Sequence, residues 1–146
     1  MRTNLSSQIS LNRVSTRYYK PENTIERSVL TRFEKIPTNI YETVDEGVSC
    51  IADEIIRKVQ ERQRDGKFCT IATGTGASLR PLFAELVRRH KEEGVSFRNV
   101  VVFNLYEYYP LTEPNNSSFN QLNELFLKQV DIDPQNVFTS VSYTHL

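Results

Sequence analysis

Asn99-Val100-Val101-Val102-Phe103-Asn104 is a continuous apolar run, typical of a strand that is covered on both faces of a sheet. A second short apolar run, Phe68–Ala72, precedes it. Between the two runs, the segment Leu79–His90 carries apolar residues at helical spacing. Strand, helix and strand make a βαβ unit, whose crossover is right-handed in nearly every known case. The sequence therefore predicts an α/β fold.

Further elements are predicted around this unit. Apolar residues recur at helical spacing over about residues 22–35, 44–65 and 117–130. Pro37 is expected to end the first of these helices and Gly66 the second, while Gly94 ends the helix between the two strands. The segment Asn136–Thr139 has the character of a third strand.

The composition excludes several classes of protein. The chain has 146 residues, with 18 basic and 18 acidic side chains, so its formal net charge is zero and no basic block marks a nucleic-acid partner. It lacks both an apolar run of about 18 residues and an N-terminal secretion signal, so no membrane segment is predicted. Cys50 and Cys69 are interpreted as buried small hydrophobes in a reducing compartment, with a disulfide as the alternative. We therefore expect a cytoplasmic domain.

The first candidate site is the loop Thr73–Ser78, which leads from a predicted strand into a helix N-terminus. Free N–H groups at such a terminus favour an anion, most often phosphate. Gly74 and Gly76 would let the backbone approach a ligand, and Thr75 and Ser78 could each donate a hydroxyl hydrogen bond. A plain tight turn without a ligand is the alternative. The spacing fits neither the dinucleotide fingerprint nor the Walker loop.

The second candidate site is the loop Leu105–Asn116, which is long for a compact domain. Glu107 follows a strand end, so it is a candidate acid, base or hydrogen-bond acceptor. The alternative is a structural carboxylate paired with a backbone N–H or an arginine. Three tyrosines around Glu107 could line a sugar pocket or pack at a subunit contact: Tyr106, Tyr108 and Tyr109.

Histidine contributes no catalytic or metal-binding set. His90 continues an apolar helix stripe and is interpreted as a residue at the edge of the core, while His145 stands one residue from the end of the chain. No Ser-His-Asp triad and no metal site can be assembled from them. We therefore predict no metal and no cofactor.

The run from His90 to Tyr108 strongly resembles the glucosamine-6-phosphate deaminase/isomerase family. Thr75-Gly76-Ala77-Ser78 stands at the place of that family's phosphate loop, and Val130–Val137 matches its later helix-to-strand segment. The resemblance extends over roughly residues 40–139 in unbroken register.

The resemblance implies a Rossmann-like three-layer sandwich with a parallel sheet, incomplete in this chain. It also implies a hexosamine 6-phosphate as the small-molecule partner, with Gly74, Thr75, Gly76, Ala77 and Ser78 around the phosphate. The family converts glucosamine 6-phosphate to fructose 6-phosphate and ammonia. The full-length protein could be a homo-oligomer.

The sequence departs from the family directly after the second strand. The usual signature there is Asp-Glu-Tyr, with the aspartate as the base that moves a proton between C2 and C1, whereas this chain has Tyr106-Glu107-Tyr108. A phenol with a pKa of about 10 is a poor base at neutral pH. Three hypotheses follow: the reaction differs, Glu107 replaces the base, or this branch binds a sugar phosphate without deaminating it.

The domain organisation follows from the same resemblance. Residues 1–39 are interpreted as an N-terminal extension with one helix, as in a longer Bacteroidetes-type variant, residues 40–139 as the N-terminal part of the deaminase-like domain, and residues 140–146 as a non-native tail. The family's ring-opening histidine and further phosphate contacts lie beyond residue 139, so the chain is expected to be an inactive fragment. Three alternatives are a non-catalytic sugar-phosphate sensor, a 6-phosphogluconolactonase-like hydrolase and an unrelated α/β binding module.

Overall fold

A computed structural model describes residues 23–33, 36, 38–108 and 117–139 of the chain. The chain divides into two compact units, residues 1–39 and 40–146. In the first unit, helix α1 (Thr24–Thr31) begins at Asn23, whose side chain accepts a hydrogen bond from the backbone N–H of Glu26 at 2.9 Å. The helix is shorter than the predicted one over about residues 22–35. Phe33, which was expected on its apolar stripe, is exposed. None of the side chains that the structure describes in this short helix is buried, so little stabilises a further turn.

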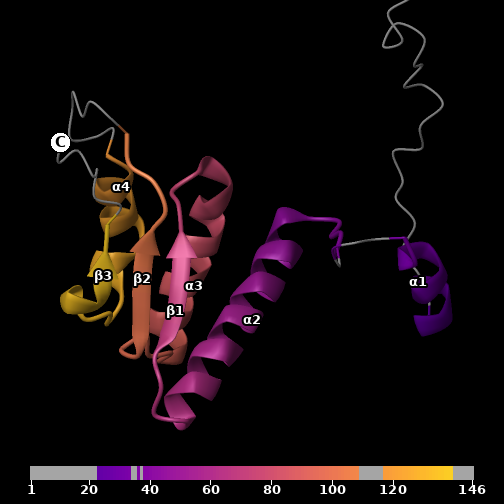
Figure 1. Cartoon of the computed structure of the whole chain (residues 1–146), viewed down its shortest axis with the longest axis horizontal. Coiled ribbons are helices and arrows are strands. Elements are labelled where there is room, and N and C mark those ends of the chain that lie inside the picture. The colour runs from indigo at the N-terminus through magenta and orange to yellow at the C-terminus, as the bar shows by residue number, and fades with distance from the viewer. Residues whose placement is uncertain (1–22, 34–35, 37, 109–116, 140–146) are drawn as a thin grey trace, which may run out of the picture. The chain divides into compact units, whose positions relative to one another are not determined.

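The second unit alternates helices and strands (Figure 1). Its α-helices and strands are α2 (Val44–Arg64), β1 (Cys69–Thr73), α3 (Arg80–Glu93), β2 (Val100–Asn104), α4 (Ser118–Leu125) and β3 (Val137–Phe138). Short 3-10 turns are η3 (Ala77–Leu79), η5 (Leu127–Gln129) and η6 (Pro134–Asn136). The strands form a parallel sheet in the order β1-β2-β3, so the predicted α/β class with a parallel sheet is confirmed.

The core of this unit lies on one face of the sheet. Val100 and Val102 of β2 are fully buried, and their partners in β1 are Cys69 and Ile71. Helices α2, α3 and α4 all pack against this face and share one hydrophobic core with it. The helices contribute Ala52, Ile56, Val59, Phe83, Leu86, Val87 and Leu122 to that core, and Phe126, directly after α4, also belongs to it.

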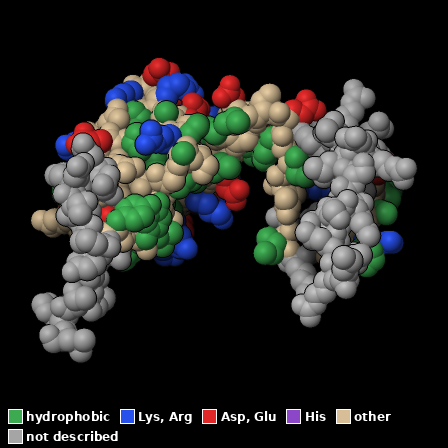
Figure 2. Space-filling model, turned by 90° about the horizontal axis from the view of Figure 1, so that it is seen from above, with side chains coloured by type: hydrophobic (Ala, Val, Ile, Leu, Met, Phe, Trp, Pro, Cys, Tyr) green, Lys and Arg blue, Asp and Glu red, His purple; other side chains and the backbone are tan. Residues whose placement is uncertain are grey.

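The opposite face of the sheet is not covered by the described residues. Phe103 is 43% exposed and Phe138 is 47% exposed, and their rings stack with centroids 5.0 Å apart. The prediction that Asn99–Asn104 is buried on both faces is therefore wrong for the described part of the chain, because all three helices contribute to the same side. Figure 2 shows hydrophobic side chains reaching the molecular surface among charged ones.

The two predicted glycine helix ends are confirmed, whereas Pro37 lies outside the described residues. Gly66 and Gly94 have φ values of 66° and 71°, the left-handed backbone that only glycine adopts at little cost. Pro81 lies in the first turn of α3, where a backbone N–H has no partner within the helix, so proline costs no hydrogen bond there. The predicted helix over 117–130 is interrupted at Phe126, whose φ of −139° ends α4. The ring of Phe126 packs in the core, with its centroid 5.4 Å from that of Phe83.

Both cysteines are free thiols; Cys69 is half-buried, but Cys50 is exposed, so its predicted burial is wrong. Cys50 lies on the face of α2 away from the core and accepts a hydrogen bond from the Tyr41 hydroxyl at 2.9 Å. Among the described residues, no helix is both long and apolar enough to cross a membrane.

Replacing Phe103 with Thr should lower self-association of the chain at little cost in stability, because this side chain is already partly exposed. We expect the free energy of unfolding to fall by about 1 kcal/mol or less, measured by urea denaturation, with weaker binding of a hydrophobic dye. Val102→Thr is the matched control on the buried face and should cost about 2 kcal/mol, because it places an unpaired hydroxyl in the core. Equal losses in the two variants would contradict the one-sided core.

Candidate functional site

The ends of β1 and β2 bring the two predicted loops together. Thr73 and Asn104 are paired in the sheet, and the backbone N–H of Leu105 donates to the carbonyl of Thr73 at 2.9 Å, which prolongs the pairing by one residue. The next residue, Tyr106, therefore lies beside the start of the loop that follows β1.

Tyr106 contacts this loop directly. The backbone N–H of Thr75 donates to the Tyr106 hydroxyl at 3.1 Å. The ring lies so close to Gly74 that a Cβ there would be 2.4 Å from the Cε1 atom of Tyr106, which is far inside van der Waals contact. Gly74 is needed here for the approach of the Tyr106 ring, a reason the sequence alone did not suggest.

A buried chain of polar side chains lies beneath this contact. The hydroxyls of Thr75 and Ser118 are 2.9 Å apart, and the Ser118 hydroxyl donates to Oδ1 of Asn104 at 3.2 Å. Nδ2 of Asn104 in turn donates to the carbonyl of Tyr106 at 2.9 Å. Thr75, Ser118 and Asn104 are all buried, so the network fixes Thr75 and the end of β2 against the N-terminus of α4.

Sequence reasoning did not single out Asn104, Ser117 or Ser118. Asn104 stands at the end of an apolar run, and a serine directly before a helical stretch is a common N-cap. The side chain of Ser117 does cap α4, because it accepts a hydrogen bond from the backbone N–H of Asn120 at 3.1 Å. The N-cap pattern could therefore have identified Ser117 and its neighbour Ser118, and the polar residue at the end of an apolar run could have identified Asn104.

Glu107 binds the N-terminus of α4 with both carboxylate oxygens. Oε1 accepts from the backbone N–H groups of Ser118 at 2.7 Å and Tyr108 at 3.0 Å. Oε2 accepts from the hydroxyl of Ser117 at 2.8 Å and the N–H of Phe119 at 3.1 Å. Burial by itself raises the pKa of Glu107, but these four hydrogen bonds together outweigh it, so the pKa lies below its ordinary value. This is the geometry of a helix-capping carboxylate, the structural alternative for this residue.

The rest of the first loop presents backbone donors to solvent. Gly76, Ala77 and Ser78 are exposed, and within the described part of the chain their N–H groups have no protein acceptor. They stand at the start of η3 and α3, whose first turn has no side-chain cap. Three free donors at a helix N-terminus can hold an anion. The structure thus brings the predicted residues Gly74–Ser78, Tyr106 and Glu107 into one region.

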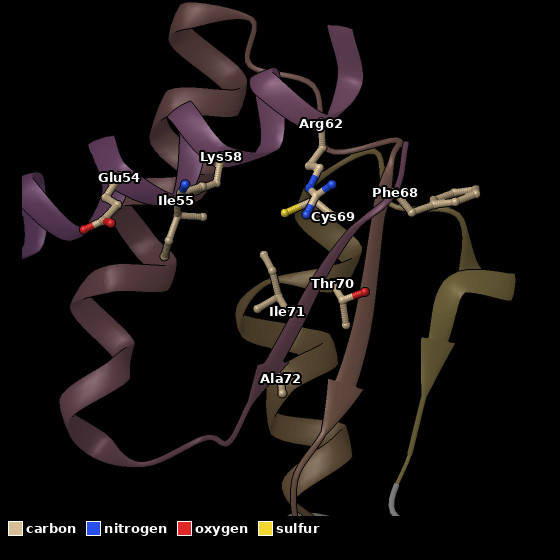
Figure 3. A pocket seen from close by; sticks show the side chains of 9 residues that line it. All are labelled: Glu54, Ile55, Lys58, Arg62, Phe68, Cys69, Thr70, Ile71 and Ala72. Carbon is tan, nitrogen blue, oxygen red and sulfur yellow. The ribbon is translucent and has the colours of Figure 1, made fainter. Parts of the chain in front are cut away.

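A groove lies elsewhere, between α2 and the outer edge of β1 (Figure 3). It has a volume of about 620 Å³ and is lined by Glu54, Ile55, Lys58, Arg62 and residues 68–72. Cys69 and Thr73 direct their backbone groups toward β2, so those of Thr70 and Ala72 face this groove. Burial raises the pKa of the Cys69 thiol, although Arg62 and Lys58 oppose this. None of the predicted site residues lines the groove, which is the open edge of the sheet.

The remaining sequence candidates are structural or lie outside the described residues. Nδ1 of His90 is 2.6 Å from the carbonyl of Val95, which anchors the half-buried ring at the edge of the core. His145 and Tyr109 lie outside the described residues. In the ranges that the structure describes, no group of three His, Cys, Asp or Glu side chains could hold a metal ion.

Known proteins show sequence similarity over the same region. The chain is 61% identical over 140 residues to a glucosamine-6-phosphate deaminase-like protein of Bacteroides thetaiotaomicron. The matched region covers 95% of the chain and 21% of that protein. It is 34% identical over 94 residues to glucosamine-6-phosphate deaminase 1 of Giardia intestinalis, covering 62% of the chain and 35% of that protein. The chain belongs to the glucosamine-6-phosphate deaminase/isomerase family. It spans about a fifth to a third of the length of these family members, and no protein-family model matches it.

Solved structures support the fold of this family. A monomeric glucosamine-6-phosphate deaminase superposes with a TM-score of 0.62 at 24% identity, over 73% of the chain and 43% of the deaminase. A protein named devB superposes with a TM-score of 0.57 at 20% identity, over 69% of the chain and 41% of its own length. These identities establish the shared fold alone.

Replacing Glu107 with Gln should destabilise the chain by about 1–3 kcal/mol at pH 7, because a charged acceptor of four hydrogen bonds becomes a neutral one. The folded pKa is lowered, so the stabilisation is complete above the unfolded pKa of about 4.3 and is lost as the pH falls through the folded pKa. Urea denaturation of both proteins between pH 7 and pH 3 should show the difference shrinking toward acid. A pH-independent difference would contradict this account.

Replacing Gly74 with Ala should displace the Tyr106 ring and cost about 1–3 kcal/mol. The same change in a Tyr106→Ala background should cost almost nothing, because the ring that excludes the Cβ is gone. The coupling energy from this double-mutant cycle is the measurement. Additive effects would show that something other than Tyr106 excludes a side chain at position 74.

Proposed function

We propose that the chain carries the phosphate-binding part of a glucosamine-6-phosphate deaminase-like protein, and that the loop Gly74–Ser78 holds the phosphate of a hexosamine 6-phosphate. The observation that carries this proposal is that Gly76, Ala77 and Ser78 are exposed residues whose N–H groups have no acceptor among the described residues. The relatives that share this region include named glucosamine-6-phosphate deaminases, which supports a sugar phosphate as the ligand.

Within the longer protein, we propose that the bound sugar is converted to a ketose phosphate with release of ammonia. The matched 73% of the chain covers only 43% of a solved deaminase, so we expect the chain to bind the ligand without turning it over. Glu107 then serves as a positioning residue, because both of its oxygens already hold α4. A cytoplasmic location and a homo-oligomeric full-length protein stay predictions.

A non-catalytic sugar-phosphate sensor is the second candidate. Tyr106 favours it, because its hydroxyl is bonded to the loop at Thr75 and no free carboxylate stands at that position. Ammonia release from glucosamine 6-phosphate by the longer protein separates the two candidates. Turnover would support the deaminase, whereas saturable binding without turnover would support the sensor.

The variant Gly76→Pro tests the phosphate site. Gly76 has a φ of −58°, which proline matches, so the substitution removes one N–H donor with little change of the backbone. Gly76→Ala is the matched control, since it keeps the N–H and its Cβ would meet only the Ser78 hydroxyl, at 3.8 Å. By calorimetry, we expect Gly76→Pro to bind glucosamine 6-phosphate about tenfold more weakly than wild type and Gly76→Ala to bind within about twofold.

Glucosamine without its phosphate is the ligand control for this experiment, and circular dichroism checks that each variant keeps its helices. The proposal predicts weak or no binding of glucosamine by wild type. Equal affinities for glucosamine and its 6-phosphate, or equal losses in the Pro and Ala variants, would overturn it.

A further inference from the structure

Thr75 is the point at which the loop after β1 turns from the interior of the protein to its surface. Gly74 and Thr75 are buried, whereas residues 76–78 are exposed. The Thr75 side chain reaches Ser118 at the start of α4, and the two hydroxyl oxygens are 2.9 Å apart. Ser118 is fully buried and Thr75 is 6% exposed. The residue directly before the proposed phosphate donors is therefore anchored from inside the protein.

The direction of the buried hydrogen bonds follows from Asn104 at their inner end. The amide of Asn104 is oriented by its Nδ2 atom, which donates to the carbonyl of Tyr106 at 2.9 Å. Its Oδ1 atom can only accept, so the Ser118 hydroxyl, 3.2 Å away, gives its hydrogen to Asn104. Because a hydroxyl has one hydrogen, Ser118 must accept from Thr75. The donors therefore run in one direction, from Thr75 to Ser118 to Asn104.

We infer that Ser118 is a positioning residue of the proposed phosphate site, which accepts the hydroxyl hydrogen of Thr75 and so keeps the backbone of residues 76–78 turned outward. The inference rests on the proposed function and deepens it. It assigns the Thr75 hydroxyl to the interior, although the sequence made that hydroxyl a candidate donor to the ligand. The ligand is then held by the N–H groups of residues 76–78, and Thr75 acts through its position.

Two further contacts hold Thr75 in the same place. Its backbone N–H donates to the Tyr106 hydroxyl at 3.1 Å, and the Tyr106 hydroxyl also has side-chain hydrogen bonds with Thr75 and Ser118. Both the backbone and the side chain of Thr75 are therefore fixed before a ligand arrives.

Burial makes the contact of Thr75 with Ser118 costly to break. If the Thr75 side chain turned outward, the buried Ser118 oxygen would lose its donor in a place where water does not readily replace it. The anchor therefore restricts the conformations open to the residues that follow Thr75. Donors that are ordered in advance lose less entropy when they bind, so this buried pair should raise the affinity for the ligand without touching it.

Calorimetry with glucosamine 6-phosphate on the 146-residue chain tests the inference with Ser118→Ala and Thr75→Val, each of which removes one hydroxyl of the pair. We expect each variant to bind about fivefold more weakly than wild type, the effect of one lost hydrogen bond. The double variant should bind no more weakly than either single one, because both act through the same contact. Thr75→Ser keeps the hydroxyl and should bind within about twofold of wild type.

Ser96→Ala is the matched control. The Ser96 hydroxyl donates to Asp131 at 2.7 Å, and it precedes β2, at the opposite end of that strand from Asn104. This variant loses a half-buried hydrogen bond and should unfold at a lower urea concentration, but its affinity should be unchanged. In NMR spectra of the free ¹⁵N-labelled chain, the amide signals of residues 76–78 should move in Ser118→Ala and stay in place in Ser96→Ala.

Unchanged affinity in Ser118→Ala would overturn the inference, as would an equal loss of affinity in Ser96→Ala. Losses that multiply in the double variant would also overturn it, because Thr75 and Ser118 would then act independently. Any of these results together with a loss in Gly76→Pro leaves the proposed phosphate site standing. Equal binding of glucosamine and glucosamine 6-phosphate by wild type would instead overturn the proposed function, and the inference with it.

Discussion

The site depends on one carboxylate, that of Glu107, which holds the N-terminus of α4 over the ends of β1 and β2. Its oxygens accept hydrogen bonds from the N–H groups of Ser118 and Phe119 and from the hydroxyl of Ser117. Only with α4 held there can the Ser118 hydroxyl contact both Thr75 and Asn104. A loop carboxylate that serves as a helix cap is favoured because it meets the positive end of the helix dipole. The positions of Thr75 and Asn104 relative to α4 follow from this contact.

Tyr106 and Gly74 depend on each other, because the Tyr106 ring packs where a side chain at position 74 would be. A phenol at position 106 reaches the first loop only because position 74 has no Cβ, and its hydroxyl is then fixed by the N–H of Thr75. The three N–H groups that follow remain exposed to a ligand. The family relationship and this donor arrangement lead to the same proposal, a site for the phosphate of an amino sugar.

The sequence predicts the parts of this structure that depend on residues close to one another along the chain. The βαβ unit, the left-handed glycines Gly66 and Gly94, and the place of the loop after β1 all follow from local patterns. The contact of Thr75 with Ser118 joins residues 43 positions apart, so no local pattern reports it. Exposure of Phe103 was missed for a related reason, since an apolar run does not show which elements cover it. For Glu107, the sequence left two roles open, and only its four hydrogen-bond partners distinguish them geometrically.

The most direct test of the phosphate site is an NMR titration of the ¹⁵N-labelled chain with glucosamine 6-phosphate, in which each backbone amide reports separately. The account predicts that the amides of Gly76, Ala77 and Ser78 shift most, with smaller shifts at Thr75 and Ser118, and that glucosamine alone leaves them unchanged. The largest shifts along the groove between α2 and β1, or the same shifts with glucosamine alone, would contradict it.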